Sequence, residues 1–220
     1  LDAYVTNGHI FERPARADLG WKQRDLLLLG DASGGFREAR CGTAFTAVQV
    51  GRGLAGGDYD DDGDLDVAIV NNGGPLQLLR NDGAAGEWIG FALQGEAGNT
   101  NGVGARVMLH FPDGDAVRWV TAGDSYQSTS DPRVLFGWTA GRKPLSVSIR
   151  WRDGESVEWG PEAWNPGHYH RVVEADGTLA VLEAAASGKP RPSLRRIAVI
   201  GGFVLAALVF ALLQFLRRSR

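Results

Sequence analysis

Residues 58–66 of this chain read Asp58-Tyr59-Asp60-Asp61-Asp62-Gly63-Asp64-Leu65-Asp66. The six carboxylates in these nine residues repel one another. At side-chain separations of about 6 Å, each like-charged pair costs about 3 kcal/mol at an effective dielectric of about 20. The apolar segments on both sides favour two buried strands joined by this acidic loop. Such a loop is either a solvated turn or a cage around a cation.

The spacing of the acids favours calcium. Carboxylates occupy positions 1, 3 and 5 of the loop, Gly63 occupies position 6, and another acid stands at position 9. Oxygen-ligand calcium loops place carboxylates at positions 1, 3 and 5, a glycine at the turn, and a backbone carbonyl at position 7. The predicted calcium ligands are Asp58, Asp60, Asp62, Asp64 (through its backbone carbonyl) and Asp66.

The loop does not fit an EF-hand, which needs a bidentate Glu at position 12. That position is Ile69, inside an apolar run. We therefore predict a strand–loop–strand calcium site, with a solvated acidic turn as the alternative. Asp61 lies outside the ligand pattern, and we expect it at the rim of the site.

The net charge of −3 is the balance of −10 on residues 1–188 and +7 on residues 189–220. An acidic body offers no basic face for neutralising phosphates, which argues against nucleic-acid binding. Cys41 is the single cysteine, so the chain has no internal disulfide.

Two stretches near the N-terminus repeat later in the chain. Residues 1–7 align with residues 65–71 at an offset of 64, and residues 26–31 align with residues 76–81 at an offset of 50. A repeat period near 50 fits the blades of a β-propeller. We therefore expect residues 1–85 to contain propeller repeats.

The shrinking offset places about 14 extra residues in the first repeat, and we assign them to the loop from His9 to Lys22. The acidic partners expected for Asp2 would precede residue 1, so the propeller region is expected to be truncated at its N-terminus. Two repeats cannot close a propeller, and their open sheet edges would need a cover.

A second, antiparallel β domain is expected over residues 86–184, as a small sandwich or barrel. Asp113-Gly114 and Asp153-Gly154 are strong hairpin signals between alternating runs. The predicted strands span residues 88–93, 105–111, 116–120, 133–138, 145–151 and 156–159. The fold class is therefore all-β, with partial propeller blades followed by this domain.

Two parts of the chain resemble known families. Residues 51–57, the acidic loop and Asn71-Asn72-Gly73-Gly74-Pro75 resemble an FG-GAP/VCBS repeat of the integrin-like propeller kind. Residues 102–107, 122–133 and 151–154 resemble an ASPIC/UnbV domain, which usually follows such repeats in cartilage-acidic-protein-like chains and their bacterial relatives. The resemblance implies an extracytoplasmic, calcium-binding, β-rich protein whose domain has no established catalytic activity.

A membrane segment follows a linker at residues 185–196. Residues 197–216 are 20 residues whose one polar member is Gln214. At 1.5 Å per residue they span about 30 Å, the thickness of a bilayer core. A basic tail follows at residues 217–220. We expect one membrane-spanning helix, with the calcium-binding body outside the cytoplasm, where calcium is plentiful, and the C-terminus inside. In a bacterium that body would be periplasmic.

Other candidate residues have simpler interpretations. His168 and His170 alternate and could form half of a metal site, but no third ligand is evident, which favours a surface strand. Ser125, Ser128 and Ser130 lack a nucleophile elbow and a base, so hydrogen bonds that stabilise their loop are expected. Tryptophans that could line a sugar platform alternate with polar residues, which favours core packing for Trp119, Trp138, Trp151, Trp159 and Trp164.

These observations favour a non-catalytic, calcium-binding interaction module outside the cytoplasm, anchored by its C-terminal helix. One alternative is an accessory subunit of a multi-subunit membrane complex, such as a respiratory or photosynthetic one, which would place protein partners around the helix. Another is a glycan-binding or hydrolytic surface protein, although the residues give carbohydrate binding no specific support.

Overall fold

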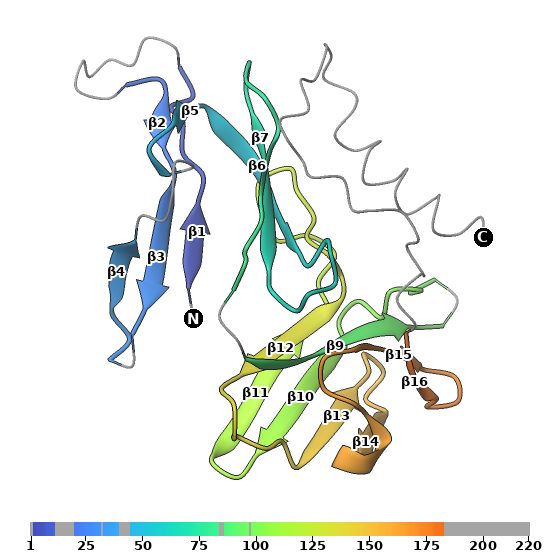
Figure 1. The fold of residues 1–220 in the computed structure, drawn as a ribbon. Helices are drawn as coiled ribbons and strands as arrows, with labels where there is room; N and C mark the ends of the chain where they lie inside the picture. The colour runs from blue at the N-terminus through green and yellow to red at the C-terminus, as the bar shows by residue number, and fades with distance from the viewer. Residues whose placement is uncertain are drawn as a thin grey trace, which may run out of the picture. The chain divides into compact units, whose positions relative to one another are not determined.

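A computed structural model describes residues 2–11, 20–31, 33–39, 45–83, 86–96 and 98–182 (Figure 1). The predicted all-β class is confirmed, since strands dominate and the helical structure in these ranges is the 3-10 turn Pro161–Ala163. The predicted linker, membrane span and basic tail at residues 185–220 lie outside the described residues. No helix within the described ranges is long and apolar enough to cross a membrane.

The chain divides into two compact units. Among the described residues, the first comprises residues 2–53 and 69–77, and the second comprises residues 54–68 and 78–182. The acidic loop thus belongs to the same unit as the second predicted β domain. The predicted domain boundary near residue 85 stays a prediction. The two compact units have different boundaries, because they divide the chain at residues 53, 68 and 77.

The first unit contains small antiparallel sheets. In one, β3 lies between β1 and β4, and in the other β2 pairs with β5. The Tyr4 ring lies 5.6 Å from the ring of Phe45, and both flank a small apolar centre. The strands are β1 (Ala3–Val5), β2 (Gln23–Arg24), β3 (Leu26–Gly30), β4 (Phe36–Ala39) and β5 (Val48–Gln49).

A three-stranded sheet has the order β6-β7-β8. Its strands are β6 (Gly51–Gly57), β7 (Asp66–Asn71) and β8 (Gln77–Leu79). The acidic loop connects β6 to β7, as its flanking apolar segments predicted. The strand–loop–strand arrangement is therefore confirmed.

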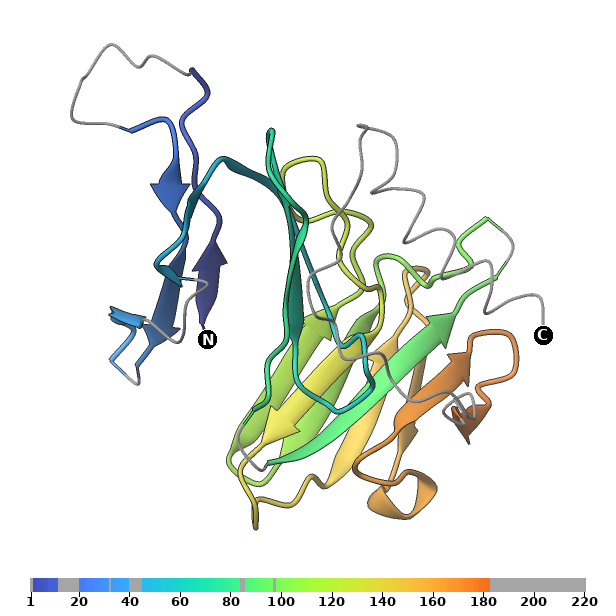
Figure 2. The ribbon, with the colours of Figure 1, turned by 45° about the horizontal axis from the view of Figure 1, so that its top comes forward.

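The second unit contains two four-stranded sheets, ordered β11-β10-β13-β14 and β12-β9-β15-β16, that form two layers (Figures 1 and 2). Their pairing is antiparallel except for β9 and β15, which run parallel. The strands are β9 (Glu87–Gln94), β10 (Arg106–Phe111), β11 (Gly114–Trp119), β12 (Val134–Trp138), β13 (Ser146–Arg150), β14 (Ser156–Trp159), β15 (Tyr169–Val173) and β16 (Leu179–Val181).

One apolar core lies between the two layers. Alternate residues of each strand face inward, as the period of two along a strand requires. The fully buried side chains of this core are Ile89, Phe91, Val107, Leu109, Val147, Ile149 and Val172. All six predicted runs form strands, and the two Asp-Gly turns close the hairpins β10–β11 and β13–β14. These two sheets form a sandwich, and the described residues contain no closed barrel.

Two aspartates at aligned positions of the predicted repeat make similar hydrogen bonds. Asp2 precedes β1, and its Oδ1 accepts a hydrogen bond from the Gly30 amide at 3.0 Å, at the end of β3. Asp66 begins β7, and its Oδ1 accepts one from the Asn81 amide at 2.8 Å, just beyond β8. In each case the aspartate at the start of one strand ties down the end of the other.

Two asparagines make a second repeated connection. The Asn7 carboxamide donates to the Arg24 carbonyl at 3.1 Å, and the Asn71 carboxamide donates to the Pro75 carbonyl at 2.9 Å. Asn7 and Asn71 are also equivalent in the sequence alignment. Each asparagine thus donates to a backbone carbonyl, and the repeat itself stays a prediction.

Candidate metal centre

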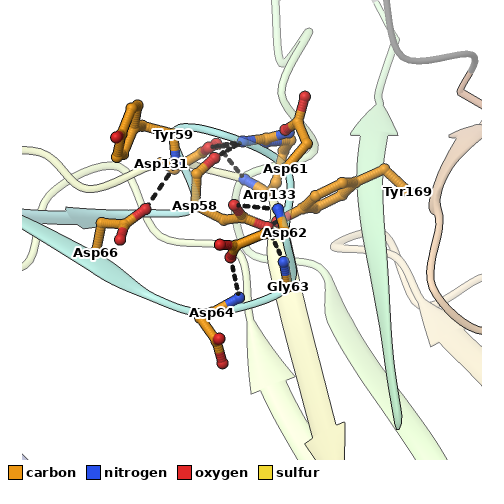
Figure 3. A network of polar contacts seen from close by, with 10 residues as sticks. All are labelled: Asp58, Tyr59, Asp61, Asp62, Gly63, Asp64, Asp66, Asp131, Arg133 and Tyr169. Carbon is orange, nitrogen blue, oxygen red and sulfur yellow. Dashed lines mark hydrogen bonds and ion pairs between the residues drawn. The ribbon is translucent and has the colours of Figure 1, made fainter. Parts of the chain in front are cut away.

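The acidic loop is folded by its own first residue. The two carboxylate oxygens of Asp58 accept hydrogen bonds from the Asp62 amide at 3.1 Å and the Gly63 amide at 2.9 Å (Figure 3). Asp66 likewise accepts from the Tyr59 amide at 3.1 Å. Aspartate favours such local bonds to backbone amides in turns. The sequence therefore curls the loop around its carboxylates.

Gly63 is required at the turn for two reasons. Its φ of +93° lies in the region that glycine adopts readily. A Cβ at this position would also lie 2.3 Å from the indole of Trp88, on β9. The turn thus rests directly on the outer face of the sandwich.

The structure brings three of the predicted ligands together. Asp58, Asp60 and Asp66 are only 2%, 7% and 1% exposed. Each offers a carboxylate oxygen, and these oxygens all lie within 4.8 Å of one another. Calcium binds oxygens at about 2.3–2.6 Å, so oxygens on opposite sides of one ion are separated by about 5 Å. The three carboxylates therefore fit around a single calcium ion.

The side chains of the other two predicted ligands do not join this group. The Asp62 side chain is exposed, and its Oδ1 accepts a hydrogen bond from the Asp64 amide at 3.0 Å. The Asp64 carboxylate points away from Asp58 (Figure 3). Asp64 was expected to act through its carbonyl, so the direction of its side chain does not bear on that role.

Without a cation, burial and mutual repulsion disfavour the ionised forms of two aspartates in the loop. Burial raises the pKa of Asp66, and the charges of Asp62 and Asp58 add to the increase, against hydrogen bonds from Asn81 and Tyr59. Burial and the charges of neighbouring aspartates also raise the pKa of Asp64. A bound divalent cation would favour the ionised carboxylates and reverse both shifts.

One arginine lies beside the cluster. Arg80 Nη1 is 3.6 Å from Asp60 Oδ2, but Arg80 also pairs with Asp82 and its side chain is 51% exposed. Arg80 shares its charge with Asp82, and the Arg133 guanidinium beside Asp58 pairs with Asp61 and Asp131, so neither arginine is committed to the three buried carboxylates alone. The cluster therefore keeps a net negative charge that suits a cation.

Two residues far away in sequence hold the loop, and the spacing of the acids did not point to either. Arg133 donates from Nη2 to the Asp58 carbonyl at 2.6 Å and from Nη1 to Asp61 Oδ1 at 2.7 Å. The Tyr169 hydroxyl donates to Asp58 Oδ2 at 2.9 Å. Arg133 and Tyr169 lie 75 and 111 residues from Asp58 along the chain. Asp61 is thus paired beside the cluster, in keeping with the rim position expected for it.

Arg133 and Tyr169 both stay protonated, so both can donate hydrogen bonds. Burial lowers the pKa of Arg133, but the hydrogen bond and charge of Asp131 outweigh it, so the net shift is upward. Burial raises the pKa of Tyr169, and the charge of Arg133 opposes this only in part. At neutral pH, Arg133 is therefore charged and Tyr169 is a neutral donor.

The serine loop stabilises the chain, as expected. Ser128 Oγ accepts a hydrogen bond from the Leu54 amide at 2.9 Å, and Ser130 Oγ accepts one from the Gly56 amide at 3.0 Å. The Asp131 amide in turn donates to the Gly56 carbonyl at 2.9 Å. The two serine hydroxyl groups thus accept from β6 amides in the way that the carbonyls of a neighbouring strand would.

The two histidines do not share a face. His168 is exposed and precedes β15, where it lies beside the Pro166 carbonyl. His170 is fully buried on the face that also carries Val172, and burial lowers its pKa. The expectation of a surface strand is wrong for His170, because this face of β15 packs into the sandwich core.

A hydrogen-bond chain on the outer face of the other sheet has the order of a catalytic triad. His110 Nε2 lies 2.8 Å from Ser148 Oγ, and His110 Nδ1 lies 2.8 Å from Asp115 Oδ1. Acyl transfer also needs amide donors for the oxyanion. His110 and Ser148 lie on β10 and β13, whose backbones are both paired on two sides. Their amides are therefore committed to the sheet, and the arrangement fits a structural link.

The tryptophans mostly serve the core. Trp138, Trp151 and Trp164 are buried, and Trp159 packs partly against the same core. Trp119 is the exception, since it is 59% exposed. Core packing is therefore confirmed for the three buried rings and wrong for Trp119, which ends the edge strand β11.

Comparison with known protein families finds a match to the second predicted β domain. No curated protein matches the chain. No FG-GAP/VCBS repeat is matched, so only the second half of the expected resemblance is supported. Residues 95–179, which include most of the sandwich strands, match the family model described as ASPIC and UnbV.

Proposed function

We propose that this chain is a non-catalytic interaction module in which the acidic loop binds calcium against an ASPIC/UnbV domain. The observation that carries the proposal is the burial of Asp58, Asp60 and Asp66 with their oxygens within 4.8 Å. Like-charged carboxylates in such a group repel by about 3 kcal/mol per pair at an effective dielectric of about 20. A calcium ion converts that repulsion into coordination.

The finer assignment of the N-terminal part as FG-GAP/VCBS-type propeller repeats belongs to the same proposal. It is supported by the acidic loop between two strands and by the hydrogen bonds that Asp2 and Asp66 repeat. The proposed repeats supply the calcium loop, and the ASPIC/UnbV domain supplies the surface on which that loop rests.

We also place the β body outside the cytoplasm, anchored by residues 197–216. The support is the length of this apolar run and the arginines Arg196 and Arg217 that bracket it. A loop of modest affinity is loaded where calcium is abundant, which is outside the cytoplasm. In a bacterium, the compartment would be the periplasm.

Calorimetry on the full chain in detergent micelles tests calcium binding. Calcium should release or absorb heat with one site per chain, and thermal melting should move upward with calcium and return with a chelator. Asp60→Asn should remove both effects.

Asp153→Asn is the matched control, because it makes the same change in a turn where Asp153 Oδ1 accepts the Glu155 amide. An asparagine keeps that acceptor, so this variant should bind calcium like the wild type. Equal calcium heats in the wild type and Asp60→Asn would refute the assigned site.

A second candidate function is an accessory subunit of a larger membrane complex. Large apolar side chains of the first unit favour it, since Ile10, Phe36 and Val48 are 75%, 57% and 52% exposed. Purification from native membranes in mild detergent decides: a stoichiometric partner supports the subunit, and a single monodisperse chain opposes it.

A further inference from the structure

We propose that Arg133 and Tyr169 are positioning residues that couple the calcium loop to the sandwich, so that calcium stabilises the ASPIC/UnbV domain as well as the loop. This inference rests on the proposed function and deepens it. It assigns the loop a structural role that extends beyond its own nine residues. Three sets of contacts carry it.

The first contact comes from β15. Tyr169 is 6% exposed, and its hydroxyl donates to Asp58 Oδ2 at 2.9 Å. Its ring lies 5.3 Å from that of Trp88, on the neighbouring strand β9. A Cβ at Gly90 would lie 2.1 Å from the Tyr169 ring, so this glycine makes room for it. The outer face of the sheet is therefore shaped to receive the tyrosine that holds Asp58.

The second contact comes from the start of β12. The Arg133 guanidinium lies 4.1 Å from the centre of the Tyr169 ring, and its Nε donates to Asp131 at 2.7 Å. Its two remaining nitrogens donate to Asp61 and to the Asp58 carbonyl (Figure 3). One side chain thus joins the loop backbone and the loop rim to the sandwich.

The third contact fixes the strand that leads into the loop. Ser128 and Ser130 accept hydrogen bonds from the amides of Leu54 and Gly56 on β6. The segment carrying these serines runs directly into Asp131 and Arg133. The entrance to the loop and its first ligand are consequently held by one continuous stretch of the domain.

These contacts make Asp58 a shared residue. Its carboxylate is a proposed calcium ligand that also accepts from Tyr169, and its carbonyl accepts from Arg133. Opening the loop would leave Arg133 without two of its acceptors and would expose the ring of Tyr169. An ion that binds only the closed loop therefore stabilises every element that must be in place for the loop to close.

Hydrogen exchange on the full chain, followed by mass spectrometry, tests the coupling. In the wild type, calcium should slow exchange in the loop and also in β9 and β15. In Arg133→Gln, calcium should still slow exchange in the loop, but its effect on those strands should be smaller, because Tyr169 alone then connects them to Asp58. Tyr169→Phe keeps the ring and should weaken calcium binding by about 10-fold, the lower end for loss of a group that orients a metal ligand.

Arg142→Gln is the control for Arg133. Arg142 also pairs with an aspartate, Asp113, and stacks on a ring, Phe111, but it does not belong to the loop contacts. Its exchange response to calcium should match the wild type. If Arg133→Gln does not fold, the Tyr169→Phe affinity decides, and an unchanged affinity overturns the coupling.

The two proposals fail in different ways. Calcium heat by calorimetry without slower exchange in β9 and β15 overturns the coupling and leaves the calcium site standing. Absence of calcium heat overturns both. If calcium slows exchange in β9 and β15 equally in Arg133→Gln and in the wild type, the role given to Arg133 is contradicted.

Discussion

The acidic loop and the sandwich core belong to one compact unit, yet different interactions stabilise them. The core is continuous and apolar, with Phe91 and Ile149 fully buried between two sheets. The loop is polar, and its buried groups are Asp58, Asp60 and Asp66. Burial of apolar area stabilises the core under any ionic condition. The stability of the loop depends on what neutralises its charge.

The largest expected effect comes from the core. Phe91→Ala removes a ring that packs on Phe136 at 6.3 Å and leaves a cavity between the sheets. Such a substitution typically costs about 3–5 kcal/mol. Denaturant unfolding should show this loss equally with calcium and with chelator. A loss of stability seen only with calcium, or only with chelator, would contradict the claim that the stability of the core does not depend on calcium.

The next effect concerns the loop. Calcium at 100 times its dissociation constant should stabilise the wild type by about 2.7 kcal/mol, if it binds the folded chain alone. Asp66→Asn should remove most of this gain, because it takes one negative charge from the ligand set while the asparagine oxygen still accepts from the Asn81 amide. Thermal melting at fixed calcium measures the gain. A wild-type gain retained in Asp66→Asn would exclude Asp66 as a ligand.

A smaller effect is expected on the outer face of the other sheet. Ser148→Ala removes the hydroxyl beside His110 and should cost about 1 kcal/mol, the usual value of a hydrogen bond. The change should be independent of calcium. A fluorophosphonate should leave Ser148 unmodified, and labelling that depends on His110 would instead reveal a nucleophile.

The smallest effect is the pH dependence of the calcium-free chain. The pKa of Asp66 is raised by burial and neighbouring charges. Its contribution to stability is therefore fully present below the ordinary aspartate pKa of about 3.9, and it is lost as pH rises through the higher folded value. Without calcium, Asp66→Asn should gain stability relative to the wild type as pH rises through this window. With calcium, protons should compete and affinity should fall towards acid pH.

The sequence predicted what depends on short spacings. Alternation and the two Asp-Gly turns located the sandwich strands, and the intervals between acids located the loop. It missed what depends on pairing between distant strands, such as the parallel contact of β15 with β9. The partners Arg133 and Tyr169 were missed for the same reason. His170 was misjudged because a short alternating run does not reveal which face the core will cover.

Luminescence of terbium, which occupies calcium sites, tests the central claim most directly. Trp88 lies against Gly63 of the loop, close enough to transfer excitation to an ion held there. Tryptophan-excited terbium emission from the full chain should appear, should be displaced by excess calcium, and should vanish in Asp60→Asn. Emission that is absent, or that persists unchanged in excess calcium and in Asp60→Asn, would contradict a calcium site in this loop.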